Sequence, residues 1–416
     1  MNAPAAWRDR CLQSVAAGAA LIAAVWWVGC APGGETEPAG KVEWEHYFEL
    51  GLQFSERSKY VEAIVYFQRA LALEPDDPRI HYHLANCYLG RDEFRQAVES
   101  YSRALELDPS YAAALYQFAS LRIQEKNYEQ ALPLLQRAVE ARPDYALAHM
   151  GMGRLFFRLG EYERALSAYA LAVAADSSLG LAWYHLGEVH SKRNDYDSAE
   201  AAYRNALDLD SESEKAMDGL GYVYYKQRRF DEALPLLEEA VRVDPLNTRA
   251  FFNLGNCYLR LGEAEKGKKA LARFARLRVL DKRVAIRKLS LLRHPEDASK
   301  YHSLGVAYGQ RGEYGKARLK YEQAIARDSG FVRAFNNLGN VFLRERRPEE
   351  AATAFRRAIA LDSTYAFAYN GLGNALLLSK RPAEALEAFS QAYRRDTTNT
   401  EFKENLEIAR RFRIPK

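Results

Sequence analysis

A period of 34 residues runs through most of the chain and limits its fold more than any other feature. Short motifs that share this spacing are HLANCY (83–88), HLGEVH (185–190), NLGNCY (253–258), SLGVAY (303–308), NLGNVF (337–342) and GLGNAL (371–376). Counted from Trp44, repeats begin at residues 44, 78, 112, 146, 180, 214 and 248, and then at 298, 332 and 366. A fixed period of this length is typical of solenoids, in which each repeat packs on its neighbours.

Small residues recur at three positions of the repeat. Position 8 is Gly or Ala in all ten repeats, whereas positions 20 and 27 are each Ala in nine. Position 24 is always large and apolar or aromatic, as in Phe67, Tyr101, Tyr169, Tyr321 and Phe355. Two helices approach closely only where their side chains are small, so positions 8, 20 and 27 are predicted contacts between antiparallel helices.

This pattern resembles the tetratricopeptide repeat, and ten such repeats cover residues 44–399. The resemblance implies an all-α fold, a right-handed superhelical solenoid of about ten helix-turn-helix units. Short helices of this kind are marginal alone and are stabilised by stacking. The expected order is seven repeats (44–281), a basic helical insertion (282–297), three repeats (298–399) and a capping helix (400–416).

The seventh repeat departs from the pattern of small residues. Position 20 is Gly267 and position 27 is Phe274, whose ring we expect to push the two helices apart. From Lys266 to Arg293 the chain has eleven Lys or Arg residues and one acid, Asp281, so the local net charge is 11 − 1 = +10. The apolar spacing predicts a lengthened second helix, with or without a kink.

Two interpretations of this basic segment remain open. One is a spacer helix with a solvated outer face. The other is a basic docking face, formed by Lys268, Lys269, Arg273 and Arg276, for an anionic envelope component such as lipid headgroups or envelope polymers, or for an acidic partner. The whole chain is only +4 at neutral pH, so the basic charge is local and does not indicate a nucleic-acid-binding protein.

The N-terminal segment is predicted to direct the chain to a membrane. Arg8 and Arg10 precede an apolar stretch that ends at Gly29-Cys30, and residues 1–29 resemble a bacterial lipoprotein signal with Cys30 as the lipidated residue. An uncleaved anchor and a cleaved secretory signal are the alternatives. Residues 30–43 read as a tether. The expected location is extracytoplasmic and membrane-anchored, on the periplasmic side, with the outer membrane favoured.

No catalytic or cofactor motif accompanies the repeats. Gly-rich phosphate loops and nucleophile or zinc signatures are missing from the sequence. His81 and His83 are two apart, so they point to different faces of a helix and do not indicate a metal site. Cys87 and Cys257 occupy equivalent positions of distant repeats, and we expect both to be buried free thiols. We therefore predict no enzyme activity, no cofactor and no metal.

By resemblance to the family, the first helix of each repeat lines a groove that binds polypeptides. At position 5 the implied groove residues include Tyr82, Tyr116 and Tyr184. Position 13 supplies a basic row, Arg158, Lys192, Lys226, Arg260 and Arg344. Asparagines at positions 6 and 9 are Asn253, Asn256, Asn337, Asn340 and Asn374. Asparagine can hydrogen-bond the backbone of an extended peptide, and a basic row favours acidic segments.

These observations predict a non-catalytic scaffold for protein–protein interaction, tethered to a membrane of the bacterial cell envelope. By resemblance, repeat lipoproteins assist the assembly of envelope machines such as pili, secretion systems or cell-wall enzymes. The partners expected are proteins or peptides, together with the membrane at the N-terminus, and not nucleic acid. The alternative is a targeting or regulatory subunit of an envelope enzyme or glycosyltransferase.

Overall fold

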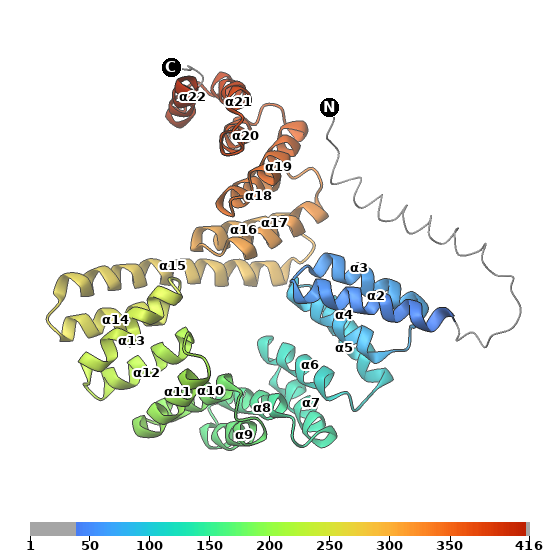
Figure 1. Ribbon diagram of the computed structural model, residues 1–416, viewed down its shortest axis with the longest axis vertical. Helices are drawn as coiled ribbons and strands as arrows, with labels where there is room; N and C mark the ends of the chain where they lie inside the picture. The colour runs from blue at the N-terminus through green and yellow to red at the C-terminus, as the bar shows by residue number, and fades with distance from the viewer. Residues whose placement is uncertain (1–38, 413–416) are drawn as a thin grey trace, which may run out of the picture. The chain divides into compact units, whose positions relative to one another are not determined.

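Helices make up all of the regular structure in the computed structural model, which describes residues 39–412 (Figure 1). The described residues divide into two compact units, one that ends at Pro109 and one that begins at Ser110. The predicted signal segment and Cys30 lie outside the described residues, and α2 begins inside the predicted tether, at Ala39. Within the described range no helix combines the length and apolar character needed to cross a membrane. The predicted all-α fold of paired helices is confirmed.

The first compact unit contains two helix pairs. Its core gathers Trp44, Phe67, Ile80 and Leu84 around the small residue Ala63. The helices are α2 (Ala39–Glu56), α3 (Tyr60–Leu73), α4 (Pro78–Gly90) and α5 (Phe94–Leu107).

The second compact unit continues the same alternation of first and second helices through eight repeats and a final helix. Its helices are α6 (Ala112–Gln124), α7 (Tyr128–Ala141), α8 (Ala146–Leu159), α9 (Tyr162–Ala175), α10 (Gly180–Lys192), α11 (Tyr196–Leu209), α12 (Glu214–Lys226), α13 (Phe230–Val243), α14 (Thr248–Arg260), α15 (Ala264–Arg293), α16 (Ala298–Arg311), α17 (Tyr314–Arg327), α18 (Val332–Arg344), α19 (Pro348–Leu361), α20 (Ala366–Leu378), α21 (Pro382–Arg395) and α22 (Thr400–Phe412).

Close approach of the two helices of a repeat depends on a small residue at position 8, which is glycine in most repeats. A Cβ atom on Gly339 would lie 2.7 Å from the Phe355 ring, and one on Gly187 would lie 2.7 Å from the Tyr203 ring. In both repeats the large side chain at position 24 therefore fills the space that the glycine leaves. The alanines at positions 20 and 27 are buried throughout. This confirms the predicted contact points between paired helices.

The turn inside each repeat places position 15 in the left-handed region of backbone conformation. Glycine occupies this position in three repeats, at Gly160, Gly262 and Gly312. The other seven repeats use residues with a Cβ atom, namely Ser58, Asp92, Lys126, Asn194, Arg228, Arg346 and Lys380. For residues with a Cβ atom this conformation costs about 1–2 kcal/mol, which the packing of the flanking helices must offset. The tight turn is thus a shared property of all ten repeats.

The two helices of the seventh repeat are not separated, contrary to expectation. α14 and α15 pack on each other along the repeat, as the helices of other repeats do, so the prediction that Phe274 forces them apart is wrong. The Phe274 ring is only half-buried and lies 5.1 Å, between centroids, from the half-exposed Phe252 ring. Gly267, which replaces alanine, lets α15 approach to within contact of the Gly255 carbonyl. The large ring is accommodated at the edge of the interface.

α15 joins the seventh and eighth repeats as one helix of 30 residues. It contacts α14 with its first part and α16 with its second, and buries Leu277 and Val284. At the end of the array, α22 buries Phe402, Leu406 and Ala409 and packs on α21. Its remaining described side chains are mostly exposed, which suits the last helix of a stack.

Cys87 and Cys257 are both fully buried free thiols, as predicted. Burial raises the pKa of each thiol, that of Cys257 to about 11. Both side chains act as small apolar groups in the core.

Candidate interaction surface on the first helices

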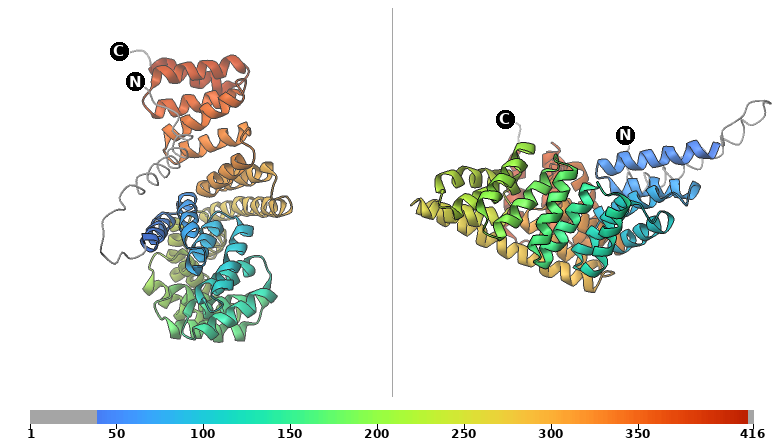
Figure 2. Two further views of the ribbon diagram at one scale, coloured as in Figure 1. Left: turned by 90° about the vertical axis from the view of Figure 1, so that its right-hand side faces the viewer. Right: turned by 90° about the horizontal axis from the view of Figure 1, so that it is seen from below.

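The first helices of consecutive repeats contact one another in the second compact unit. These contacts join α6 to α8, α8 to α10, α10 to α12 and α12 to α14, and later α16 to α18 and α18 to α20 (Figures 1 and 2). Between second helices of consecutive repeats, the described part of the chain has no comparable contact. The first helices therefore form the closely spaced layer, named here the first-helix surface.

Position 5 on this surface packs against position 6 of the next repeat. The Tyr116 ring lies 3.2 Å from the point where a Cβ on Gly151 would stand. His302 and Asn337 are joined by a hydrogen bond, with 2.9 Å between His302 Nε2 and Asn337 Nδ2. Tyr116 and Tyr184 are buried, and Tyr82 is half-buried. Tyr116 and Tyr184 thus present little area to a ligand, whereas Phe252, at position 5 of the seventh repeat, is 45% exposed.

A buried charge occupies position 5 of the sixth repeat. The Asp218 carboxylate is fully buried, and its Oδ1 accepts a hydrogen bond of 2.8 Å from Asn253 Nδ2. Its Oδ2 accepts from Arg249 Nε. Arg249 and Asn253 stand at positions 2 and 6 of the seventh repeat. Both carboxylate oxygens are therefore satisfied by the following repeat, as burial of a charge requires.

Arg249 also reaches back across two repeats. Its terminal nitrogens lie 3.5 Å from Glu188 Oε1 and 3.5 Å from the Tyr184 hydroxyl. Burial would lower the pKa of Arg249, but the Asp218 carboxylate raises it above its usual range. Burial would likewise raise the pKa of Glu188, but hydrogen bonds from His185 and Tyr184 and the charge of Arg249 lower it. Both side chains stay ionised at neutral pH and join α10, α12 and α14.

The same arrangement recurs at the end of the array. Asn370, at position 5 of the tenth repeat, accepts a 2.9 Å hydrogen bond from Asn405 Nδ2 and donates one of 3.2 Å to Glu401 Oε1. Glu401 and Asn405 lie on α22, at the positions that Arg249 and Asn253 hold on α14. α22 therefore docks on the tenth repeat as the first helix of a following repeat does.

Comparison with known sequences decides the family. Three sequence profiles described as tetratricopeptide repeat match the chain, one over residues 55–117, one over 178–245, and one over 116–180, 219–278, 302–366 and 365–400. The chain belongs to the tetratricopeptide repeat family. A search of curated protein sequences finds no match.

Solved tetratricopeptide repeat structures resemble parts of the chain. PilF of Pseudomonas aeruginosa is 18% identical, covering 51% of this chain and 96% of its own, with a TM-score of 0.46. YrrB, described as a TPR protein with an unusual peptide-binding site, is 22% identical. The match covers 44% of this chain and 95% of YrrB, with a TM-score of 0.36. The TPR domain of P58(IPK) is 17% identical, covering 89% and 98%, with a TM-score of 0.24.

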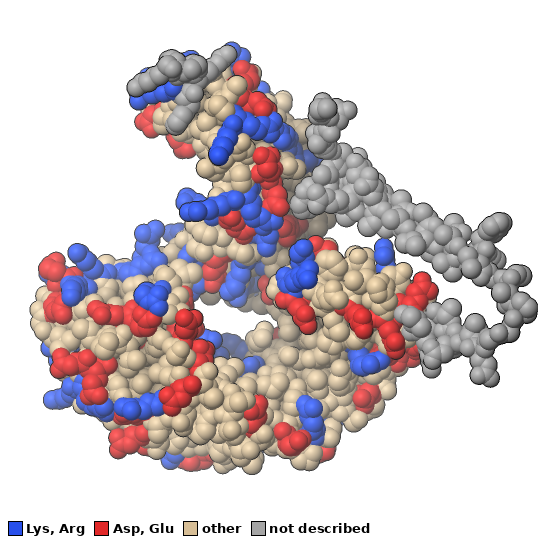
Figure 3. All heavy atoms as spheres, viewed as in Figure 1, with Lys and Arg blue, Asp and Glu red and all other residues tan. Residues whose placement is uncertain are grey.

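Five cations at position 13 of the tetratricopeptide repeats are exposed on the first-helix surface. They form the basic row Arg158, Lys192, Lys226, Arg260 and Arg344. Among the described residues, no carboxylate lies within ion-pair distance of any of them. Elsewhere, on the face drawn in Figure 3, acidic and basic side chains are interspersed over α12–α14. The row is therefore without an ion-pair partner among the described residues.

The predicted asparagines divide between two environments. Asn253 is buried and Asn337 half-buried, and both serve the contacts between repeats. At position 9, Asn340 is exposed, whereas Asn256 and Asn374 are half-buried. Asn256 Nδ2 donates to the Phe252 carbonyl at 2.8 Å, which leaves its carbonyl oxygen as an acceptor. Position 9 thus remains open to a ligand where position 6 does not.

The predicted basic docking face is partly occupied by contacts within the protein. Lys268 pairs with Glu265 at 2.9 Å. Arg273 is half-buried and donates to the Pro245 carbonyl at 3.2 Å. Lys269 and Arg276 are exposed.

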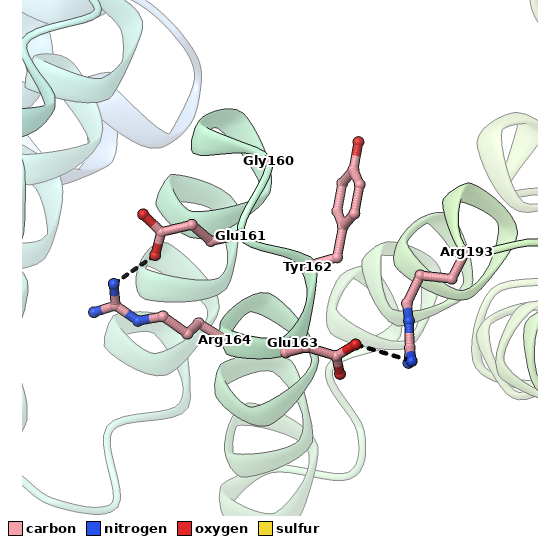
Figure 4. Close-up of a pocket in the computed structure, with 6 residues that line it drawn as sticks. All are labelled: Gly160, Glu161, Tyr162, Glu163, Arg164 and Arg193. Atoms are coloured by element: carbon pink, nitrogen blue, oxygen red, sulfur yellow. Dashed lines mark hydrogen bonds and ion pairs between the residues drawn. The ribbon is translucent and has the colours of Figure 1, made fainter.

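A shallow hollow of about 340 Å³ lies beside the turn between α8 and α9 (Figure 4). Its charged side chains are paired, Glu161 with Arg164 at 2.5 Å and Glu163 with Arg193 at 2.9 Å. The remaining lining residues are Gly160 and Tyr162. Within the described residues, no group of three or more His, Cys, Asp or Glu side chains has an arrangement suited to a metal ion.

Sequence reasoning missed Asp218 and Arg249. The signal was present, because Asp218 puts an acid at position 5, where the five preceding repeats have an aromatic side chain or methionine. An acid at such a position needs a cation from the next repeat, and Arg249 stands 31 residues further on.

Proposed function

We propose that the protein is a non-catalytic scaffold that binds an extended, acidic polypeptide along its first-helix surface. The observation that carries this proposal is the basic row, which places an exposed cation at the same position of four successive repeats, the fourth to the seventh. A ligand that crosses those repeats meets the cations in turn. Extended backbone with acidic side chains has the matching shape and charge.

Asparagines at position 9 would fix the peptide backbone. An extended peptide leaves its N–H and C=O groups without internal partners, and the amide side chain both donates and accepts. Asn256, Asn340 and Asn374 are the three candidates that retain exposure. The cations would add charge-assisted hydrogen bonds to Asp or Glu side chains, or to a free carboxylate.

The scaffold is proposed to act in the bacterial envelope, tethered to the outer membrane through Cys30. The support for this placement is the order of Arg8 and Arg10, the apolar stretch and Gly29-Cys30. A tethered array with a peptide-binding surface would hold partner proteins at the membrane and assist the assembly of an envelope complex.

Affinity capture from solubilised envelopes tests the binding surface. The variant reverses four cations of the basic row to Glu at Arg158, Lys192, Lys226 and Arg260. A matched control reverses four exposed arginines of the second helices α13, α19 and α21, at Arg242, Arg356, Arg357 and Arg394. We expect the row variant to lose partners that wild type and control retain. Equal partner yields from all three proteins would refute the proposed surface.

A further inference from the structure

The second half of α15 has an apolar face that no other part of the described chain covers. Val279, Ile286 and Leu289 are 53%, 56% and 52% exposed, and Leu292 is 67% exposed. Val279 and Ile286 are seven residues apart, and Leu289 follows three later, so the three share one side of the helix. Leu277 and Val284 are buried on the opposite side. This outer stripe is therefore additional to the face that packs in the array.

Cations flank the stripe, and none of them forms an ion pair with an acidic side chain of the described residues. Arg276, Arg283 and Arg287, also at spacings of seven and four, are exposed along one border, and Lys282 lies within the stripe. Arg283 donates to the Gln310 side chain at 3.2 Å, which leaves its charge uncompensated. From Lys282 to Pro295 the sequence contains no acid. Asp281, the one acid of the basic segment, pairs with Arg311 at 2.6 Å.

We infer that the outer face of α15 lies on an anionic phospholipid bilayer surface. A helix with an aliphatic stripe and basic borders lies in the plane of the interface, with its apolar side about 5–10 Å into the headgroup boundary. Anionic headgroups supply the charge that the cations lack. In the right-hand view of Figure 2, α15 (yellow to light orange) runs along an outer edge of its unit.

A bilayer fits this face better than a protein partner. The stripe lies along a single helix, so a helix-in-groove complex would require the partner to supply the groove. Its side chains are aliphatic, while the cores of protein interfaces are enriched in aromatic residues and Met. The lysine and arginine side chains are long enough to reach headgroups while their stems cover the apolar side chains.

This inference rests on the proposed membrane tether only for the presence of a bilayer nearby. The two therefore need separate readouts. Flotation of the full chain with phosphatidylcholine vesicles, which α15 is not expected to bind, reports the N-terminal anchor, whereas a probe on α15 reports the helix.

Site-directed spin labelling of the full chain provides the probe. Ile286→Cys carries a nitroxide, Leu171→Cys on α9 is the control of similar exposure, and the parent protein without an added cysteine gives the background signal. The protein is reconstituted in phosphatidylcholine vesicles with and without phosphatidylglycerol. Accessibility to oxygen and to a water-soluble nickel chelate then reports insertion.

We expect the label at position 286 to gain oxygen and lose nickel accessibility only in phosphatidylglycerol vesicles, while the label at position 171 stays aqueous. Arg283→Glu with Arg287→Glu should lower the ratio of inserted to aqueous label by at least about twenty-fivefold, fivefold for each cation removed. Arg356→Glu with Arg394→Glu, which change the net charge equally, should leave that ratio unchanged.

An aqueous label at position 286 in floated, phosphatidylglycerol-containing vesicles would overturn the inference and leave the anchor standing. An acidic protein partner would give this result.

Discussion

Asp281 and Arg311 form an ion pair between α15 and the end of α16, with 2.6 Å from Oδ1 to Nε. Asp281 Oδ2 also accepts a 2.7 Å hydrogen bond from the Thr248 hydroxyl, at the start of α14. Arg311 in addition donates to the Leu246 carbonyl at 3.4 Å. Asp281, the only acid in the basic segment, therefore joins α14, α15 and α16. These helices lie at the insertion that interrupts the 34-residue period.

Replacement of Asp281 should loosen this joint. Asp281→Ala removes both hydrogen bonds and leaves Arg311 without one of its acidic partners. Because both side chains are partly exposed, we expect a loss of about 1–2 kcal/mol in the free energy of unfolding. Glu265→Ala, which breaks the exposed pair with Lys268 on the same helix, should cause no measurable change. Urea unfolding followed by circular dichroism compares the two, and equal midpoints would contradict the role of Asp281.

Gly339 should not tolerate a methyl group. Phe355 fills the space between Gly339 and Gly371, so Gly339→Ala forces the ring to move and should cost about 1–3 kcal/mol. Gly315→Ala is the matched control, because a Cβ there meets nothing within 4 Å and alanine favours the helix by about 0.5 kcal/mol. Thermal unfolding should shift in opposite directions for the two variants. A shift in the same direction would mean that Phe355 has room to relax.

Lys380 should be replaceable by glycine with a gain in stability. Its φ of 58° is the left-handed conformation shared by position 15 of every repeat. Lys380→Gly relieves that strain, and we expect a gain of about 0.5–1 kcal/mol. Lys403→Gly, at an exposed site inside α22, should lose about 1 kcal/mol. Amide hydrogen exchange of α20–α22 measures the stability of both variants. A loss of stability in Lys380→Gly would argue against strain in the turn.

His83 should make the first compact unit less stable in acid. Burial against Phe67 and Tyr82, together with the charge of Arg79, lowers the pKa of His83 to about 4. The unfolded chain binds a proton near its ordinary pKa of 6.5, whereas the folded chain does not until about pH 4. Stability from this residue is therefore full above pH 6.5 and falls between pH 6.5 and 4, by at most about 3 kcal/mol.

The substitution His83→Gln tests this assignment, because glutamine does not titrate. Urea midpoints of the full chain at about pH 7.5 and about pH 5 should differ less in the variant than in wild type. The same difference in both proteins would assign the acid sensitivity to other groups.

The repeats and their close contacts could be predicted because the physical requirement is local and recurs. Close packing needs a small side chain at position 8, and Gly187 and Gly339 display that need in the sequence itself. The chemistry of position 5 was harder to foresee. Tyr116 and Tyr184 look like ligand contacts when each repeat is considered alone, but the next repeat covers them. Only the stacking geometry shows which face position 5 meets.

The seventh repeat shows the same limit. Phe274 breaks the pattern of small residues at position 27. Whether its ring forces the helices apart depends on whether the ring can lie at the edge of the helix interface, and here it does, against the Phe252 ring. Seven of the position 15 residues carry a Cβ atom, so composition gave no sign of a left-handed turn there. The exposed cations of the basic row remain predictions as ligand contacts.

Photo-crosslinking tests the central claim, that partners bind along the first helices, most directly. A photoreactive amino acid replaces Lys192 on α10, Lys226 on α12 or Asn340 on α18, and Leu171 on the second helix α9 serves as the exposed control. After irradiation of cells, we predict covalent adducts with the same partner from the three first-helix sites and none from position 171. Adducts from position 171 alone, with none from the first helices, would contradict the account.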